Sequence, residues 1–305
     1  MKRLLPIWVV GALAAWLAGC QAVTETVGEV GAAVGEATGT VSPEQAESIR
    51  KTSKAVAKTF EDITPEQEYY IGRSVAATIL HAYKVYDQEA LNHYLNVLGQ
   101  GLAEASEKPE TFGGYHFIAM DSDEINAFAA PGGLIMISRG LIGCCRNEDE
   151  LAAVLAHEVA HVQYNHGLKA IKQGRLTSAL TILATESAKS FGGKELADLT
   201  EAFEGSITDI TSTMMNSGYA RGLEYDADKG AVQILKRVGY NPKGLTNMLA
   251  EMQKRLKPGA HDFAQTQPAP QERIKEIADE VTSYPDIVEP AARQNRFAKS
   301  VKARL

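Results

Sequence analysis

The chain has 305 residues, 45% of them hydrophobic and 23% charged, which is enough for one or two globular domains with a substantial core. Its formal net charge of −7 excludes the broad basic surface that nucleic-acid binding needs. We therefore expect no nucleic-acid partner.

The start of the chain has the pattern of an export signal. Two basic residues precede Leu4–Gly19, an uncharged apolar run that is shorter than the ~20 residues of a membrane-spanning helix. The run ends in the letters LAGC at Cys20, which resembles a bacterial lipobox, so we predict a lipoprotein signal peptide over residues 1–20 that ends at a lipid-modified Cys20. An ordinary cleavage site and a signal anchor are the alternatives. Gln21 resembles the residue that follows the cysteine in lipoproteins sent to the outer membrane.

Residues 21–60 are predicted to form a tether and a leading helix ahead of a globular domain at residues 61–305. Ala22–Val41 has low complexity and no aromatic residue, which favours a flexible tether over a core element. A helix on the membrane surface is the alternative, but this stretch lacks the Lys and Arg that attract lipid headgroups. Helical character begins at Ser42-Pro43, a favoured pair at helix starts.

Two packing helices are predicted next. Thr64 before Pro65 indicates a helix start, and apolar residues then recur at helical spacing. A second helix is predicted over Glu89–Glu104, with its leucines on one face. We expect His81 and His93, on these helices, to be surface or satisfied residues rather than metal ligands.

Three short extended runs predict a small sheet before the next helix. They are Tyr115–Asp121, Ile125–Ala130 and Leu134–Ser138, and a Pro-Gly-Gly turn separates the last two. Cys144 and Cys145 follow. Because a disulfide between adjacent cysteines closes a strained ring, we expect two buried free thiols.

The stretch Leu151–His166 carries His157, Glu158 and His161 as an HExxH motif on a largely apolar helix. Histidines four residues apart lie about 40° apart around a helix and about 6 Å apart along it, so one metal ion can contact both, while Glu158 can reach a water beside that ion. The motif also occurs by chance, and satisfied core histidines are the alternative. The apolar surroundings favour a metal, because buried imidazoles need partners. The following span, Gly167–Ala220, favours a peripheral helical hairpin, with a mobile lid as the alternative.

A third ligand is expected from Ala220–Leu235, because catalytic zinc usually has three protein ligands and a water. Glu224 and Asp228 share one helical face. We predict that Glu224 binds the metal and that Asp228 accepts the outer N–H of a ligand histidine, His157 above all. Asp226 points away. The alternative is a solvated acidic face, but the neighbouring apolar residues indicate burial.

Three separated motifs resemble those of metallopeptidase family forty-eight. They are the HExxH helix, the preceding Asn126–Ile142 and the following Arg221–Asp228, and the resemblance covers roughly Pro65 to Ile277. It implies an α+β, mainly helical, gluzincin-like fold with a small sheet beside the HExxH helix. It also implies one Zn²⁺ per chain, held by His157, His161 and Glu224, with Glu158 as the catalytic base.

The resemblance extends to Gln267–Arg273. Arg273 matches an arginine of the family and is predicted to stabilise a tetrahedral oxyanion; a salt bridge on a helix surface is the alternative. Gln267 departs from members in which a histidine here can cap the zinc. In zinc peptidases of this design, an edge strand of the sheet pairs with an extended substrate backbone, whereas a plain structural hairpin is the alternative.

The predicted function is that of a zinc metalloendopeptidase, a hydrolase that cleaves unfolded or misassembled envelope proteins. No further apolar run of spanning length follows the signal, so the chain is closest to compact lipoprotein members, lipid-anchored at the periplasmic face of the bacterial outer membrane. Outer-membrane assembly machinery is the expected partner. The alternatives are a zinc-stabilised, non-proteolytic chaperone or assembly factor for outer-membrane proteins, and an inactive lipoprotein with a chance motif and no zinc.

Overall fold

The computed structural model describes residues 21–39, 63–171, 218–256, 268–285 and 287–305, together with Ser42, Pro43, Ala46, Glu47, Arg50, Thr211 and Met215. The chain divides into two compact units, Met1–Ile63 with Ile171–Ser206, and Thr64–Ala170 with Ile207–Leu305. The predicted signal peptide with Cys20, most of the span after His166, and Gln267 lie outside the described residues. No helix in the described ranges combines the length and the apolar character that crossing a bilayer requires.

In the first unit, α2 (Gln21–Ala37) is a helix, whereas the composition favours a flexible tether. The helix ends at Ala37, Gly39 just after it has a positive φ of 68°, and the Thr38 hydroxyl donates to the Val34 carbonyl. Arg50 pairs with Glu36 across 2.9 Å. Alanine and glutamate in this stretch favour helix, but its valines, threonines and glycines do not, so local propensity alone does not explain the difference.

The second unit begins with two helices that follow the sequence prediction. α4 (Pro65–Ala82) starts at Thr64, whose side chain accepts from the Gln67 N–H while the Gln67 side chain accepts from the Thr64 N–H. α5 has the predicted bounds, Glu89–Glu104, and buries its leucine face. The prediction for both helix starts is confirmed.

The small sheet is also confirmed. It contains β1 (His116–Met120), β2 (Ala127–Ala130) and β3 (Leu134–Ser138), in the order β1-β3-β2. β1 runs parallel and β2 antiparallel to β3. The short helix η1 (Pro131–Gly133) joins β2 to β3. Because β3 lies in the middle of the sheet, β2 is an edge strand.

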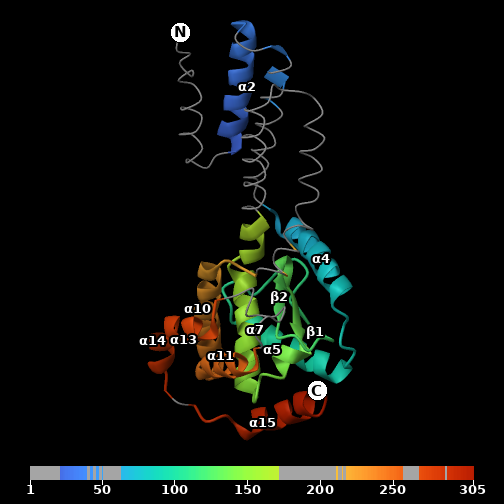
Figure 1. Ribbon diagram of the computed structural model, residues 1–305, viewed down its shortest axis with the longest axis vertical. Coiled ribbons are helices and arrows are strands. Elements are labelled where there is room, and N and C mark those ends of the chain that lie inside the picture. The colour runs from blue at the N-terminus through green and yellow to red at the C-terminus, as the bar shows by residue number, and fades with distance from the viewer. Residues whose placement is uncertain are drawn as a thin grey trace. The chain divides into compact units, whose positions relative to one another are not determined.

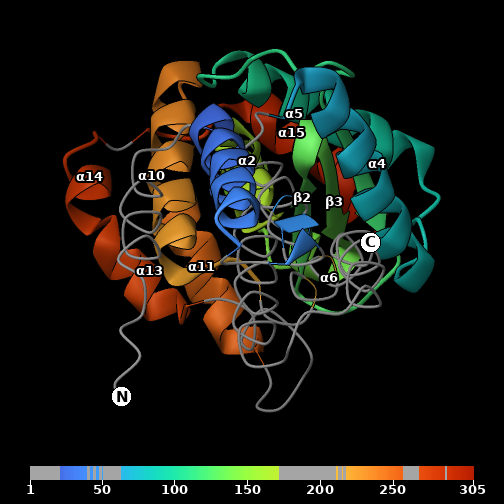
Figure 2. The ribbon, with the colours of Figure 1, turned by 90° about the horizontal axis from the view of Figure 1, so that it is seen from above.

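The central element is α7 (Glu148–Gln163), of which every residue except Gln163 is buried. Figures 1 and 2 show the sheet on one side of α7 and α10 (Arg221–Val238) with α11 (Lys243–Arg255) on the other. Five shorter elements complete the unit: α6 (Arg139–Ile142), α13 (Pro270–Glu276), α14 (Ala278–Thr282), α15 (Ala291–Phe297) and η2 (Ala298–Lys302). The mainly helical α+β fold is as predicted.

A buried carboxylate anchors the first turn of α7. Glu148 has no exposed surface, and it accepts hydrogen bonds of 2.8 Å from the hydroxyls of Tyr94 and Tyr240. Arg296, on α15, donates to the same carboxylate. A negative charge at a helix N-terminus is stabilised by the helix dipole. Three distant segments of the chain therefore converge on the start of the helix that carries the HExxH motif.

Small residues let α10 approach α7 closely. A Cβ built on Gly230 would lie 2.8 Å from the Ala160 Cβ and 2.8 Å from the ring of Tyr164. Real Cβ atoms essentially never come this close, so glycine at this position sets the separation of the two helices.

Cys144 and Cys145 are buried free thiols, as expected. Burial raises the pKa of Cys144 to about 11, so this thiol stays protonated and unreactive at neutral pH.

Two glycine substitutions test the packing of α4. A Cβ on Gly72 would overlap the Pro131 carbonyl group, whereas a Cβ on Gly101, an exposed position of α5, meets nothing within 4 Å. We expect Gly72→Ala to lower the free energy of unfolding by about 2 kcal/mol through overpacking, and Gly101→Ala to raise it by about 0.5–1 kcal/mol through helix propensity. Urea denaturation measures both. Equal effects of the two substitutions would contradict the close contact of α4 with η1.

Candidate metal centre

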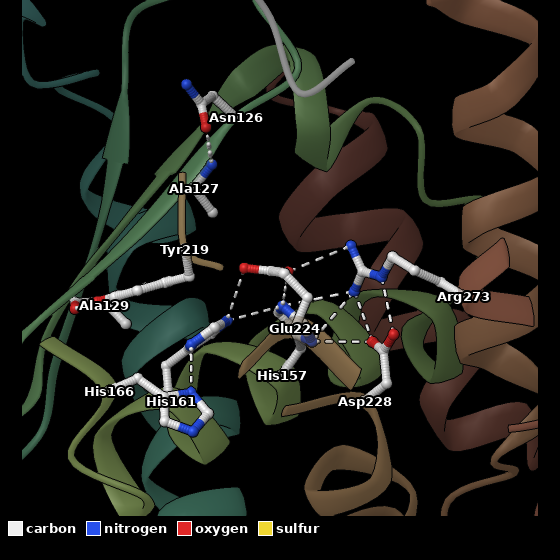
Figure 3. A network of polar contacts seen from close by, with 10 residues as sticks. All are labelled: Asn126, Ala127, Ala129, His157, His161, His166, Tyr219, Glu224, Asp228 and Arg273. Carbon is white, nitrogen blue, oxygen red and sulfur yellow. Dashed lines mark hydrogen bonds and ion pairs between the residues drawn. The ribbon is translucent and has the colours of Figure 1, made fainter. Parts of the chain in front are cut away.

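Two histidine rings from α7 face each other in the interior. His157 and His161 are 4% and 2% exposed, and their Nε2 atoms lie 3.0 Å apart (Figure 3). The one-turn spacing of the motif produces this arrangement. At this distance the two nitrogens either share one proton or direct both of their lone pairs at the same cation.

Glu224, from α10, completes the group. Its Oε2 lies 3.3 Å from the His157 Nε2, and its Oε1 lies 3.5 Å from the His161 Nε2. Glu224 is fully buried, and within the described part of the chain neither carboxylate oxygen has a hydrogen-bond partner; the Arg273 Nη1 is 3.7 Å away. The three ligand atoms lie within 4.8 Å of one another. Two imidazoles and an under-satisfied buried carboxylate fit a zinc ion, whose bonds to such atoms are about 2.0–2.2 Å long.

Asp228 lies one turn further along α10 and contacts the outer side of His157. Its Oδ1 is 3.0 Å from the His157 Nδ1, which is the contact that the sequence predicts. Burial tends to raise the pKa of Asp228, but the charge and hydrogen bonds of Arg273 outweigh burial and lower it to about 2. The ionised carboxylate accepts the Nδ1–H of His157, so the Nε2 lone pair of this ring points toward His161 and Glu224.

Arg273, on α13, lies against this pair. Its Nε donates to the Asp228 Oδ2 across 2.8 Å, and its Nη2 donates to Oδ1. Arg273 is 1% exposed, so the alternative of a surface salt bridge is wrong. The contact supports a positioning role through Asp228, while its predicted role at an oxyanion stays a prediction.

Glu158 follows His157 on α7 and is 5% exposed. Burial raises its pKa to about 7, with His157 lowering it and Glu224 raising it. A carboxyl group with a pKa close to the working pH both accepts and returns a proton readily.

His166 is a member of this group to which the sequence reasoning gave no role. The chain leaves α7 through Asn165, whose positive φ of 54° turns it back, and the His166 Nδ1 lies 2.9 Å from the His161 Nδ1. His166 is fully buried, and burial lowers its pKa to about 4, so the ring is neutral and can accept a hydrogen bond. If His161 carries its proton on Nδ1, its Nε2 lone pair is available to a cation. In the sequence, the position of His166 five residues after His161 is the feature that could have indicated this contact.

Tyr219 is a second residue of the site that the sequence pattern does not indicate. Its ring stacks on His161, with 4.4 Å between centroids and 20° between planes, and its hydroxyl donates to the Ala129 carbonyl of β2 across 3.0 Å. Nothing in its local sequence indicates this position. Asp226, His81 and His93 are exposed, as expected.

Matched substitutions test the buried ion pair. Arg273→Met should lower the free energy of unfolding by about 4 kcal/mol, because it leaves Asp228 buried without its cation. Arg221, at the start of α10 and 73% exposed in its pair with Glu272, is the control, and Arg221→Met should lower the free energy of unfolding by less than about 1 kcal/mol. Urea denaturation in the presence of a chelator measures both, and similar losses would contradict the burial of the pair.

Comparisons with known proteins agree with this geometry. The model of "Peptidase family M48" matches residues 89–281. The chain is 28% identical over 241 residues to a "Beta-barrel assembly-enhancing protease" of Yersinia pestis, covering 76% of this chain and 46% of that protein. It is 26% identical over 243 residues to the protein of the same name in Escherichia coli K12, covering 77% and 48%, and 24% identical over 160 residues to the "Metalloprotease LoiP" of Escherichia coli K12, covering 52% and 60%.

The chain thus spans about half the length of the assembly-enhancing proteases that it matches. The matched region contains α5, the sheet, α7 and α10, and with them every residue of the His157, His161 and Glu224 group. The chain belongs to peptidase family M48, a family of metalloproteases, as its motifs predict.

Proposed function

We propose that the chain is a zinc-dependent endopeptidase that cleaves unfolded or misassembled envelope proteins, and that it is anchored through Cys20 at the periplasmic face of the outer membrane. The convergence of His157, His161 and Glu224 in a buried site, with Glu158 beside them, carries the proposal. The names of the relatives, which refer to β-barrel assembly, support outer-membrane proteins as substrates and the assembly machinery as a partner.

The residues divide the work of peptide hydrolysis. A zinc ion, when bound by His157, His161 and Glu224, supplies Lewis acidity that polarises water and a peptide carbonyl. Glu158 takes the proton from the attacking water and returns it to the leaving amine. Asp228 orients His157, and Arg273 in turn holds Asp228 ionised. No covalent bond between enzyme and substrate is needed.

The edge strand β2 supports an unfolded polypeptide as the substrate. A strand that joins a sheet edge is held by main-chain hydrogen bonds, which tolerate many sequences but require an extended, unfolded segment. A folded protein cannot offer its backbone in this way. The proposed quality-control role therefore follows from selection for extended chain rather than for a particular side chain.

The first test is Glu158→Gln. This variant should keep its fold and its zinc but lose about 10²- to 10⁴-fold in kcat/KM on casein, because the amide cannot accept the proton. Zinc content by mass spectrometry and cleavage on gels are the measurements. Glu104→Gln, at an exposed position of α5, is the control and should cleave as the wild type does. Normal cleavage by Glu158→Gln would contradict the proposed role of this residue. If the wild type binds unfolded outer-membrane proteins without cleaving them, the assembly-factor alternative is favoured.

The second test removes the metal. At a free zinc concentration of 100 times Kd, binding stabilises the fold by about 2.7 kcal/mol, so a chelator should shift urea unfolding to lower concentration. His161→Ala should show no such shift, whereas His93→Ala, at an exposed site, should respond as the wild type. A chelator that affects all three proteins equally, or none, would argue against metal binding at this site.

A further inference from the structure

The free edge of β2 is defined by its pairing with β3. The Ser138 N–H donates to the Asn126 carbonyl across 3.0 Å, so these two residues form a hydrogen-bonded pair. Because such pairs alternate along an antiparallel ladder, Ala127 and Ala129 direct their N–H and C=O groups away from β3. These are the backbone groups that an added strand would use.

Side chains of the protein itself contact this edge. The Asn126 Oδ1 accepts from the Ala127 N–H across 3.0 Å, and the Tyr219 hydroxyl donates to the Ala129 carbonyl across the same distance (Figure 3). Two side-chain groups thus occupy positions at which the backbone of a neighbouring strand would donate and accept.

Tyr219 also connects this edge with the metal site. While its hydroxyl contacts β2, its ring stacks on His161 at a centroid distance of 4.4 Å. An extended peptide that pairs with β2 and brings a carbonyl beside His161 must pass through the space that this side chain spans.

We propose that the Tyr219 hydroxyl is a placeholder for a substrate backbone N–H: it satisfies the Ala129 carbonyl in the resting protein and is displaced when an extended polypeptide pairs with β2. This inference rests on the proposed function, in which β2 receives the substrate. It assigns Tyr219 a part in substrate affinity and none in the chemical step. Each binding event exchanges one hydrogen bond to Ala129 for another, so the tyrosine weakens binding while keeping the edge satisfied between substrates.

The test compares binding and turnover in Tyr219→Phe, which keeps the ring on His161 and removes only the donor. In the non-cleaving Glu158→Gln background, fluorescein-labelled casein should bind about fivefold more tightly when Tyr219→Phe is added, both with and without zinc, as measured by anisotropy. In the otherwise wild-type protein, Tyr219→Phe should lower KM by a similar factor and leave kcat and zinc content unchanged.

The matched control is Tyr86→Phe. The Tyr86 hydroxyl also donates to a backbone carbonyl, that of Arg304, across 2.8 Å, but the backbone of Tyr86 contacts β1 at Ala119 rather than the edge of β2. This variant should change neither casein binding nor KM.

Several results would overturn the placeholder. Weaker or unchanged casein binding by Tyr219→Phe would do so, as would a lower kcat at constant KM, which would make the hydroxyl a donor to the reacting carbonyl. If Tyr219→Phe tightens casein binding but the wild-type protein does not cleave casein, the placeholder stands and the proposed function is contradicted. If the wild type cleaves casein but Tyr219→Phe leaves casein binding unaltered, only the placeholder is contradicted. If no variant binds casein, the placeholder and the proposed function are both contradicted.

Discussion

The contact of α10 with α7 is the constraint on which the rest of the site depends. Each helix presents two ionisable groups one turn apart, His157 and His161 on α7 and Glu224 and Asp228 on α10. These groups face each other because Gly230 lets α10 approach α7. A side chain at this position would push the helices apart, and the carboxylate would no longer lie between the two imidazole nitrogens.

The close packing creates a charge imbalance in a dry environment. Three buried carboxylates, those of Glu158, Glu224 and Asp228, surround one guanidinium, that of Arg273. When all three are ionised the cluster has two more negative than positive charges, which a divalent cation neutralises. Burial is the largest cause of the raised pKa of Glu158, and the charges of Glu224 and Asp228 add to it. Burial and Arg273 lower the pKa of His157, yet the neighbouring carboxylates of Asp228 and Glu224 raise it to about 9.

The parts of this arrangement that are local in sequence could be predicted. The spacing of the HExxH motif and of Glu224 and Asp228 fixes which side chains share a helical face, and the three extended runs before α7 form the sheet. Contacts between distant segments could not be predicted in this way. Neither the stacking of Tyr219 on His161 nor the burial of Arg273 against Asp228 leaves a periodic pattern, because each depends on the tertiary packing of α10, α13 and β2.

The C-terminal residues show how far the support of the site extends. Arg293 pairs with Asp149 and Arg296 pairs with Glu148, so two guanidinium groups from α15 hold the first turn of α7. The family match ends at residue 281, before α15 begins. Deleting residues 291–305 would leave the buried carboxylates of Glu148 and Asp149 without their guanidinium partners and loosen the helix that carries both histidines. A truncated chain that fails to hydrolyse peptides would therefore be no sign that the deleted residues touch substrate.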